Sequence, residues 1–274
     1  MVYLKTFKLS DKKISNENIY PYCVLKNKEP NVFIFENTTI LYGNNGSGKS
    51  TILNIIAHKL NLKGRERNNP EVIGTVSYFE DFANDCTYEL GENENSRKIY
   101  RLPENSRYIK SEEILYEIRK IQQSAVLQES IESNLARERG LEKAREFLDS
   151  KEGQKQFGRF EFAQDKYSNG ETTMQILEDT IQPDTLYLLD EPEVSLSPQN
   201  QVELAKKINE MARLLGVQFI IATHSPFMLG ILNAKIYNLD TDDYKIQKWS
   251  ELENVRYFYD FFKSKENEFL KKDD

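Results

Sequence analysis

The sequence has little cysteine, histidine or tryptophan, and it has no long apolar run. Its 274 residues include two cysteines, Cys23 and Cys86, which are far apart and lack the short spacing of a metal site. A reduced, cytoplasmic chain is the simpler interpretation, and a disulfide is the alternative. No stretch approaches the roughly 20 apolar residues that cross a bilayer, and residues 1–10 alternate instead of forming the apolar block of a signal peptide. If the protein serves a membrane, another subunit must cross it.

The charge balance also lacks a basic excess. A net charge of −7 argues against an overall basic coat for nucleic acid, although a local basic patch remains compatible with it. With 39% hydrophobic residues, the chain has enough apolar side chains for a core. Its length fits one α/β domain with an insertion.

The first hundred residues are expected to contain short strands around one helix. Residues 3–9, 32–35 and 38–42 are short apolar runs, and the last is rich in β-branched residues and stops at a glycine. Residues 50–62 then have apolar side chains at helical spacing. The pattern is strand, loop, helix. The segment that follows is polar, with two further strand candidates at residues 72–79 and 98–102.

The middle of the chain is expected to be helical. From residue 111 to 125, apolar side chains recur at three- and four-residue spacing. Residues 128–155 are densely charged, which is typical of a solvated helical pair; a charged docking surface is the alternative. An α/β pattern returns with a strand at 186–189, a helix at 198–215 and a strand at 218–222.

The loop after residue 42 matches the complete pattern G-x-x-x-x-G-K-[ST]. Glycines let the backbone curl so that successive N–H groups point at phosphate oxygens, and the following helix adds its positive N-terminal end. Lys49 is predicted to reach the β- and γ-phosphates, and the Ser50 hydroxyl is predicted to bind Mg²⁺. After Gly43, the predicted ATP-binding residues are Asn44, Asn45, Gly46, Ser47, Gly48, Lys49, Ser50 and Thr51.

Two later strands carry polar residues at their ends. Residues 186–189 run into Asp190 and Glu191, and residues 219–222 run into Thr223 and His224. The carboxyl ends of parallel strands meet at one sheet edge, where ligands bind in such folds. Asp190 is therefore predicted to hold Mg²⁺, Glu191 to activate the attacking water, and His224 to contact the γ-phosphate.

Ser168-Asn169-Gly170-Glu171 resembles the signature of ABC ATPases, in the S-x-G-E form common in the SMC, RecF and OLD groups. It precedes Asp190 by 22 residues (190 − 168), about the interval that this family uses. The resemblance implies that these four residues begin a helix and bind the ATP held by another subunit. It therefore implies a homodimer that forms around ATP.

Residues 190–198 resemble the D-E-P-E-x-x-L-H-P segment of OLD-like stand-alone ATPases, with Ser197 in place of the usual histidine. The implied fold is α/β: a P-loop NTPase of the ABC ATPase type, mainly a parallel sheet, with an antiparallel N-terminal part and an inserted helical subdomain. The expected domains are an ATP-binding lobe at 1–110, the helical subdomain at 111–167 and a C-terminal lobe at 168–274.

The resemblance implies a Mg²⁺-dependent ATPase that drives or licenses a partner protein. SMC- and OLD-like relatives often act on nucleic acid, in repair or antiviral defence. This chain lacks their coiled-coil arms and a fused nuclease acid cluster. An effector or nuclease partner would then supply the output, and nucleic acid would be contacted indirectly. The alternatives are the ATPase subunit of an ABC membrane transporter and an ATP sensor that dimerises without useful hydrolysis.

Two features stay unassigned at this level. No Q-loop is identifiable, and Tyr20 and Tyr22 are either adenine contacts or core residues. The aromatic segment 255–262 would present Val255, Phe258, Tyr259 and Phe262 on one helical face, with two further aromatic residues on another. Such a segment is either buried on both faces or packs with one face and offers the other to a partner.

Overall fold

The computed structural model describes residues 1–26, 28, 32–66, 77–92, 97–113, 176 and 179–270. The chain divides into two compact units. The larger contains Met1–Ser111, Ile181–Val194 and Gln201–Asp274, and the smaller contains Glu112–Thr180 and Ser195–Asn200. Every element and site described below belongs to the larger unit, except the start of one helix, α9.

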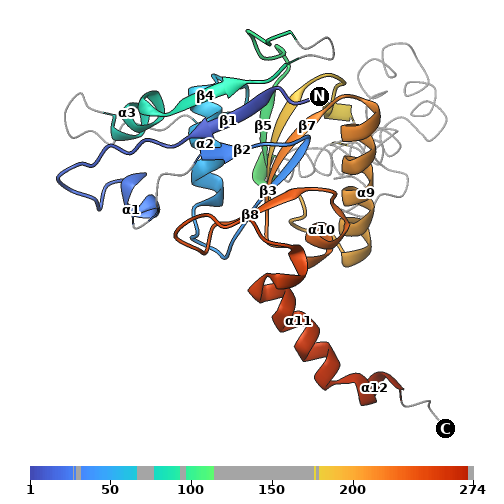
Figure 1. Ribbon diagram of the computed structural model, residues 1–274. Helices are drawn as coiled ribbons and strands as arrows, with labels where there is room; N and C mark the ends of the chain where they lie inside the picture. The colour runs from blue at the N-terminus through green and yellow to red at the C-terminus, as the bar shows by residue number, and fades with distance from the viewer. Residues whose placement is uncertain are drawn as a thin grey trace, which may run out of the picture. The chain divides into compact units, whose positions relative to one another are not determined.

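A five-stranded parallel sheet forms the centre of the larger unit (Figure 1). Its strands, in spatial order, are β5 (Arg107–Lys110), β6 (Leu186–Asp190), β7 (Gln218–Thr223), β3 (Thr38–Tyr42) and β8 (Lys235–Asn238). All residues of β3, β6 and β7 are buried, as expected for parallel strands covered on both faces. The register pairs Tyr42 with Thr223 and Asp190 with Ala222, so these three strands end at the same edge.

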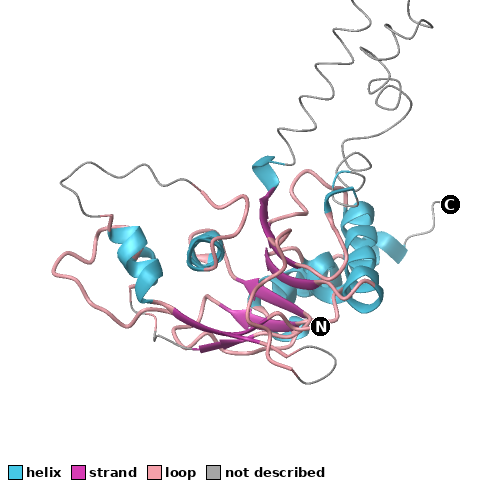
Figure 2. Cartoon of the chain, turned by 90° about the horizontal axis from the view of Figure 1, so that it is seen from above, coloured by secondary structure: helices cyan, strands magenta, loops and turns pink. Residues whose placement is uncertain are grey.

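Helices cover both faces of this sheet. Helix α2 (Lys49–Lys59) lies on one face and α9 (Pro198–Leu214) on the other, as Figures 1 and 2 show. Helix α2 is buried along most of its length, whereas α9 buries one stripe at helical spacing. The short helix α10 (Pro226–Ile231) follows β7.

A smaller antiparallel sheet is built from the N-terminal part. Its order is β2 (Val32–Ile34), β1 (Leu4–Lys8) and β4 (Thr87–Leu90). The short helix α1 (Tyr22–Leu25) precedes β2 in the chain. Helix α3 (Tyr78–Asp85) precedes β4 and contacts α2. The buried Gln218 side chain joins the two sheets, because its Oε1 accepts from the backbone N–H groups of Tyr3 and Leu4, at 2.8 Å each. The predicted α/β fold with a parallel sheet and an antiparallel N-terminal part is confirmed; the predicted helical subdomain lies almost entirely outside the described residues.

The structure corrects two predicted strands. Within 72–79, residues 77–79 are described, and Tyr78 already begins helix α3, with Ser77 as its N-cap accepting from the Glu80 backbone N–H at 3.4 Å. Residues 98–102 form no strand and contribute one isolated bridge, between Lys98 and Glu92. The strands β4 and β5 were missed, because each has four residues and few are buried.

The chain continues after β8 through the 3₁₀ helix η1 (Trp249–Glu251), α11 (Glu253–Ser264) and α12 (Glu266–Leu270). Figure 1 shows α11 leading away from the sheet. Val255 is the one buried residue of α11, so the alternative that both aromatic faces are core is wrong. The alternative in which one whole face packs on the domain is wrong as well, because Phe258, Tyr259 and Phe262 on that face are exposed.

Two expectations from composition can be compared with the described residues. Both cysteines are free thiols, so the disulfide alternative is wrong. In the described part of the chain, no helix combines the length and the apolar character needed to cross a membrane.

Candidate active site

The loop between β3 and α2 needs glycine where the chain turns most tightly. A Cβ at Gly43 would come within 2.8 Å of the Ser47 Cβ, which is closer than two carbons can pack. Gly48 has a φ of +97° and ends the loop as the N-cap of α2. This left-handed conformation is open to glycine at little cost. The glycines therefore hold a curled backbone at the N-terminus of an eleven-residue helix.

This loop offers polar groups to an anion. The Ser47 Oγ is buried and has no hydrogen-bond partner among the described residues, which is costly unless a ligand supplies one. Asn44, Asn45 and Gly46 are exposed, whereas Lys49 and Thr51 are buried at the start of α2. The donors and the positive end of α2 fit a phosphate group.

Lys49 lies folded along this loop. Its side chain is 4% exposed, and its Nζ donates to the backbone oxygens of Gly43, at 2.7 Å, and Asn44, at 3.1 Å. The same Nζ lies 3.4 Å from the Glu191 Oε1. A buried ammonium is tolerable because these three oxygens surround it. The ammonium thus lies between the phosphate loop and the end of β6.

Asp190, the last residue of β6, faces the first turn of α2. Its Oδ1 accepts from the Ser50 hydroxyl at 3.0 Å, and its Oδ2 accepts from the Tyr108 hydroxyl at 2.9 Å. Burial raises the pKa of Asp190, although the two hydrogen bonds oppose that shift. A hydroxyl oxygen beside a carboxylate is the hard oxygen donor set that Mg²⁺ prefers, so Ser50 and Asp190 fit this ion.

Glu191 and His224 form the next pair at this edge. Glu191 has a φ of +46°, which is uncommon for a side chain of its size and is found where a site imposes strain. The His224 Nδ1 lies 3.2 Å from the Glu191 Oε1. This hydrogen bond, together with the Lys49 charge, lowers the pKa of Glu191, and the same hydrogen bond raises the pKa of His224. Glu191 is therefore held ionised beside the Lys49 ammonium and the His224 ring.

A buried acid supports the loop that carries His224. The Thr223 hydroxyl donates to Glu193 in a short hydrogen bond and accepts from the Ser225 backbone N–H at 3.0 Å. Ser225 then caps α10, accepting from the Met228 N–H at 3.2 Å. Burial raises the pKa of Glu193, whose side chain sequence reasoning did not single out. His224 is thus fixed between two anchored neighbours.

The phosphate loop is also tied to the C-terminal part of the chain. The Asn44 backbone N–H donates to the Asp240 carboxylate at 2.9 Å, and the Asn44 Oδ1 accepts from the Asn254 Nδ2 at 2.7 Å. Asp240 follows β8 and Asn254 lies in the first turn of α11. Neither residue belongs to a recognisable motif, so no sequence signal pointed to them.

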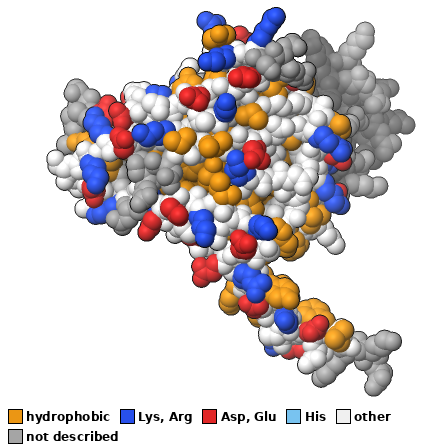
Figure 3. Space-filling model, in the orientation of Figure 1, with side chains coloured by type: hydrophobic (Ala, Val, Ile, Leu, Met, Phe, Trp, Pro, Cys, Tyr) orange, Lys and Arg blue, Asp and Glu red, His pale blue; other side chains and the backbone are white. Residues whose placement is uncertain are grey.

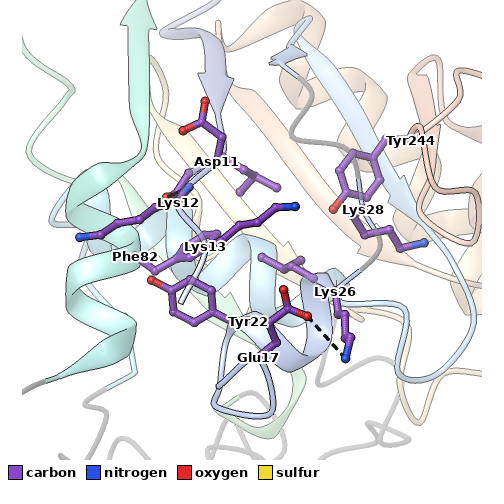
Figure 4. Close-up of a pocket in the computed structure, with 12 residues that line it drawn as sticks. Asp11, Lys12, Lys13, Glu17, Tyr22, Lys26, Lys28, Phe82 and Tyr244 are labelled. Carbon is purple, nitrogen blue, oxygen red and sulfur yellow. Dashed lines mark hydrogen bonds and ion pairs between the residues drawn. The ribbon is translucent and has the colours of Figure 1, made fainter. Parts of the chain in front are cut away.

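A pocket of about 420 Å³ lies beside this loop (Figure 4). Leu25 lines this pocket and also lies next to the loop, since its Cδ2 is 3.7 Å from the point that a Cβ on Gly48 would occupy. Four lysines line it, with three aromatic rings: Lys12, Lys13, Lys26, Lys28, Tyr22, Phe82 and Tyr244. Lys26 pairs with Glu17 at 3.5 Å. The Tyr244 hydroxyl is buried without a hydrogen-bond partner among the described residues.

The two N-terminal tyrosines separate in the structure. Tyr22 lines this pocket, whereas Tyr20 hydrogen-bonds to Thr51 and Asn54 and stacks on Phe79 with ring centroids 5.5 Å apart. Tyr20 therefore supports α2. Tyr22 is a core residue, buried and packed edge-on against Phe82 with ring centroids 5.1 Å apart. The predicted signature Ser168-Asn169-Gly170-Glu171 lies outside the described residues.

The comparisons with known proteins come from sequence and structure. Residues 157–229, about a quarter of the chain, match the family described as AAA ATPase domain, and this match includes Asp190, Glu191 and His224. No curated protein sequence matches the chain.

Three solved structures illustrate the structural likeness. The Smc head domain from Pyrococcus furiosus, bound to the C-terminal domain of ScpA, is 15% identical, with 97% of this chain and 100% of that chain covered and a TM-score of 0.43. The SMC head domain from Thermotoga maritima is 15% identical, with 86% and 94% covered and a TM-score of 0.42.

The third is cbiO1 from Clostridium perfringens, part of an ABC transporter complex. It is 14% identical, with 94% of each chain covered and a TM-score of 0.46. Residues 157–229 are therefore similar to the AAA ATPase domain family, and the loop after β3 and the acid pair after β6 are consistent with this similarity.

Proposed function

We propose that the chain binds ATP with Mg²⁺ at the shared edge of β3, β6 and β7, hydrolyses it, and acts on a partner protein as an ATP-dependent homodimer. One observation supports this most strongly. Lys49, the Ser50–Asp190 pair and the Glu191–His224 pair converge on one sheet edge, with contacts of 3.0 to 3.4 Å between residues that are up to 142 positions apart (191 − 49).

The phosphates of ATP bind the curled loop in this proposal. Backbone N–H groups of the loop and the free Ser47 hydroxyl donate to phosphate oxygens. Lys49, now bound to two loop oxygens and Glu191, turns to the β- and γ-phosphates. Ser50 and Asp190 would hold Mg²⁺, which neutralises charge on the phosphates.

Glu191 acts as the general base. Its lowered pKa keeps the carboxylate ionised, and its contact with Lys49 supports a position beside the γ-phosphate. It accepts a proton from the water that attacks the γ-phosphorus. His224, on the same carboxylate, donates a hydrogen bond to a γ-phosphate oxygen.

The nucleoside of ATP enters the lysine-lined pocket. The pocket shares Leu25 with the phosphate loop, and its aromatic walls suit a planar base. The buried Tyr244 hydroxyl offers one specific hydrogen bond to the ribose or base. Among the lysines that line the pocket, Lys28 is less available to a ligand, because its Nζ already donates to the backbone oxygens of Leu239 and Thr241 at 2.9 and 3.1 Å.

The signature Ser168-Asn169-Gly170-Glu171 completes the site of the second subunit in the proposed dimer. An effector or nuclease would then respond to the dimer, in antiviral defence or nucleic-acid metabolism. The S-x-G-E form of the signature and the D-E-P-E form of residues 190–193 favour a stand-alone ATPase over a transporter subunit.

Calorimetry with ATP and Mg²⁺ tests this proposal. Lys49→Ala should weaken ATP binding by tens-fold or more, since it removes one charge-assisted contact worth on the order of 2–3 kcal/mol. The matched control is Lys59→Ala at the other end of α2, where Nζ donates to the exposed Asn84 backbone oxygen. Equal ATP affinity in wild type and Lys49→Ala would overturn the assignment of the phosphate loop.

A further inference from the structure

The C-terminal helices concentrate exposed large apolar side chains in one short stretch of the described chain. Seven large apolar side chains on α11 and α12 have exposed fractions of 44 to 71%. They are Tyr257, Phe258, Tyr259, Phe261, Phe262, Phe269 and Leu270. At roughly 200 Å² for each side chain, they leave on the order of 800 Å² uncovered. This is the area that each partner buries in a standard-size interface, about 800 Å².

A groove lies where α11 leaves the body of the larger unit. It has a volume of about 590 Å³, and its lining includes Phe227, Ile231, Trp249, Phe258, Tyr259 and Phe262. Two of the exposed side chains, Phe269 and Leu270, lie on α12, beyond the far end of α11. The Phe269 ring packs edge-on against Phe262, with ring centroids 6.3 Å apart, so the apolar surface continues from the groove along α11 to α12. The chain thus carries an apolar groove and, at the other end of the same strip, an exposed apolar plug formed by Phe269 and Leu270.

Charge on these helices does not oppose contact with an identical copy. Residues 253–270 carry three basic and four acidic side chains, which leaves a net charge of −1 (3 − 4). The basic residues are Arg256, Lys263 and Lys265, and the acidic residues are Glu253, Asp260, Glu266 and Glu268. Figure 3 shows basic and acidic side chains interspersed with apolar ones along α11 and α12, which together we call the arm. Two such arms meet with little net repulsion.

We propose that α11 and α12 form an antiparallel, two-fold symmetric contact with the same helices of a second copy, without nucleotide. In an antiparallel pair, the end of one arm lies beside the start of the other, so Phe269 and Leu270 of each chain fill the groove of its partner. Such an interface uses the same patch twice and closes on itself, as expected for a dimer. This contact is separate from the proposed ATP-dependent one and does not rest on it.

Sedimentation of the full chain without nucleotide tests the contact. At tens of micromolar protein, wild type and Lys49→Ala should both be dimers, since interfaces of this size reach micromolar affinity or better. Phe258→Asp combined with Phe262→Asp should weaken dimerisation at least tenfold. The matched control is Tyr100→Asp, an aromatic side chain that is 86% exposed elsewhere. ATP binding by the double variant shows that the body of the larger unit remains folded.

Disulfide trapping tests the placement of the plug. In a Cys23→Ser background, a Phe269→Cys chain is mixed with a Ser250→Cys chain, because Ser250 lines the groove. A covalent heterodimer is expected from this mixture, and none when Tyr100→Cys replaces Ser250→Cys.

Three results would overturn the proposal: a monomeric wild type without nucleotide, dimerisation unchanged by the two aspartates, or no trapped product. Binding of a monomeric chain to phosphatidylglycerol vesicles through the same two phenylalanines would likewise overturn it, in favour of a lipid surface. Loss of ATP binding in Lys49→Ala with an intact dimer would separate this interface from the ATP site.

Discussion

The sheet edge and the C-terminal helices place polar and apolar side chains in opposite ways. At the edge, Lys49 and Asp190 are buried charged groups, and each has at least two partners within 3.4 Å. On α11, the aromatic rings are exposed and Val255 alone is buried. Burying charge costs free energy unless partners compensate it, and exposing rings forgoes burial energy. The edge is therefore organised before a ligand arrives, whereas the rings on α11 would gain burial energy only from the proposed second copy.

The largest expected difference between the two regions is in the free energy of unfolding. Leu188→Ala, in the fully buried centre of β6, should cost about 2–5 kcal/mol, because it removes buried methyl groups and leaves a cavity. Tyr257→Ala, at a side chain that is 71% exposed, should change stability by about 0.5 kcal/mol or less in dilute protein. Urea denaturation measures both. Comparable losses would show that α11 is packed as tightly as the sheet.

The next effect concerns catalysis at the edge. Glu191→Gln should lower the turnover of ATP by about 100-fold or more, because the amide cannot take the proton from water. ATP should still bind, since the loop and the Ser50–Asp190 pair are unchanged. A nucleotide-dependent dimer should accumulate when Glu191→Gln is combined with Phe258→Asp and Phe262→Asp, which weaken the contact proposed without nucleotide. Phosphate release and sedimentation with ATP report these two results. The control is Glu203→Gln, in an exposed pair with Lys206 on α9. Wild-type turnover in Glu191→Gln would remove this carboxylate from catalysis.

A smaller effect is expected from pH. The hydrogen bond to Glu191 raises the pKa of His224 in the folded chain, so the imidazolium stabilises the fold. That stabilisation is fully present below the ordinary histidine pKa of about 6.5 and is lost as the pH rises through the raised value. The melting temperature of wild type should therefore exceed that of His224→Gln most clearly at low pH, and the gap should narrow above about pH 6.5. The gap should be small, because the ring is 44% exposed and water screens the pair. A gap that widens with pH would contradict the assigned pair.

The smallest effect tests whether the two regions communicate. Asn254→Ala removes the 2.7 Å hydrogen bond between α11 and Asn44 of the phosphate loop. An exposed hydrogen bond of this kind is worth about 0.5 kcal/mol, so ATP affinity should fall by roughly twofold. Calorimetry of this variant, with Asn233→Ala as a surface control, decides the question. Identical affinities would mean that the loop and the arm are independent.

Much of the sheet edge was predictable from local patterns. The phosphate loop, the Asp190–Glu191 pair and His224 each follow an apolar run that ends at a polar residue, and parallel strands bring such ends together. By contrast, Tyr108 lies 82 positions from Asp190 and Asn254 lies 210 positions from Asn44. No local pattern links such pairs. The first two residues of α3, Tyr78 and Phe79, were assigned to the end of a strand because aromatic residues favour strands, although Ser77 and Glu80 carried the spacing of a helix N-terminus.

The sequence by itself determined where the chain turns and which residue types stand at those turns. Gly43 and Gly48 stand where a Cβ or an ordinary φ would not fit, and Lys49 follows them directly. Only the tertiary structure decided which surfaces stay open. The spacing of Val255, Phe258 and Phe262 defines a helical face, but burial depends on whether another element lies against it. In this chain another element covers Val255. Among the described residues, none covers much of Phe258 and Phe262, because α11 leaves the sheet after its first turn.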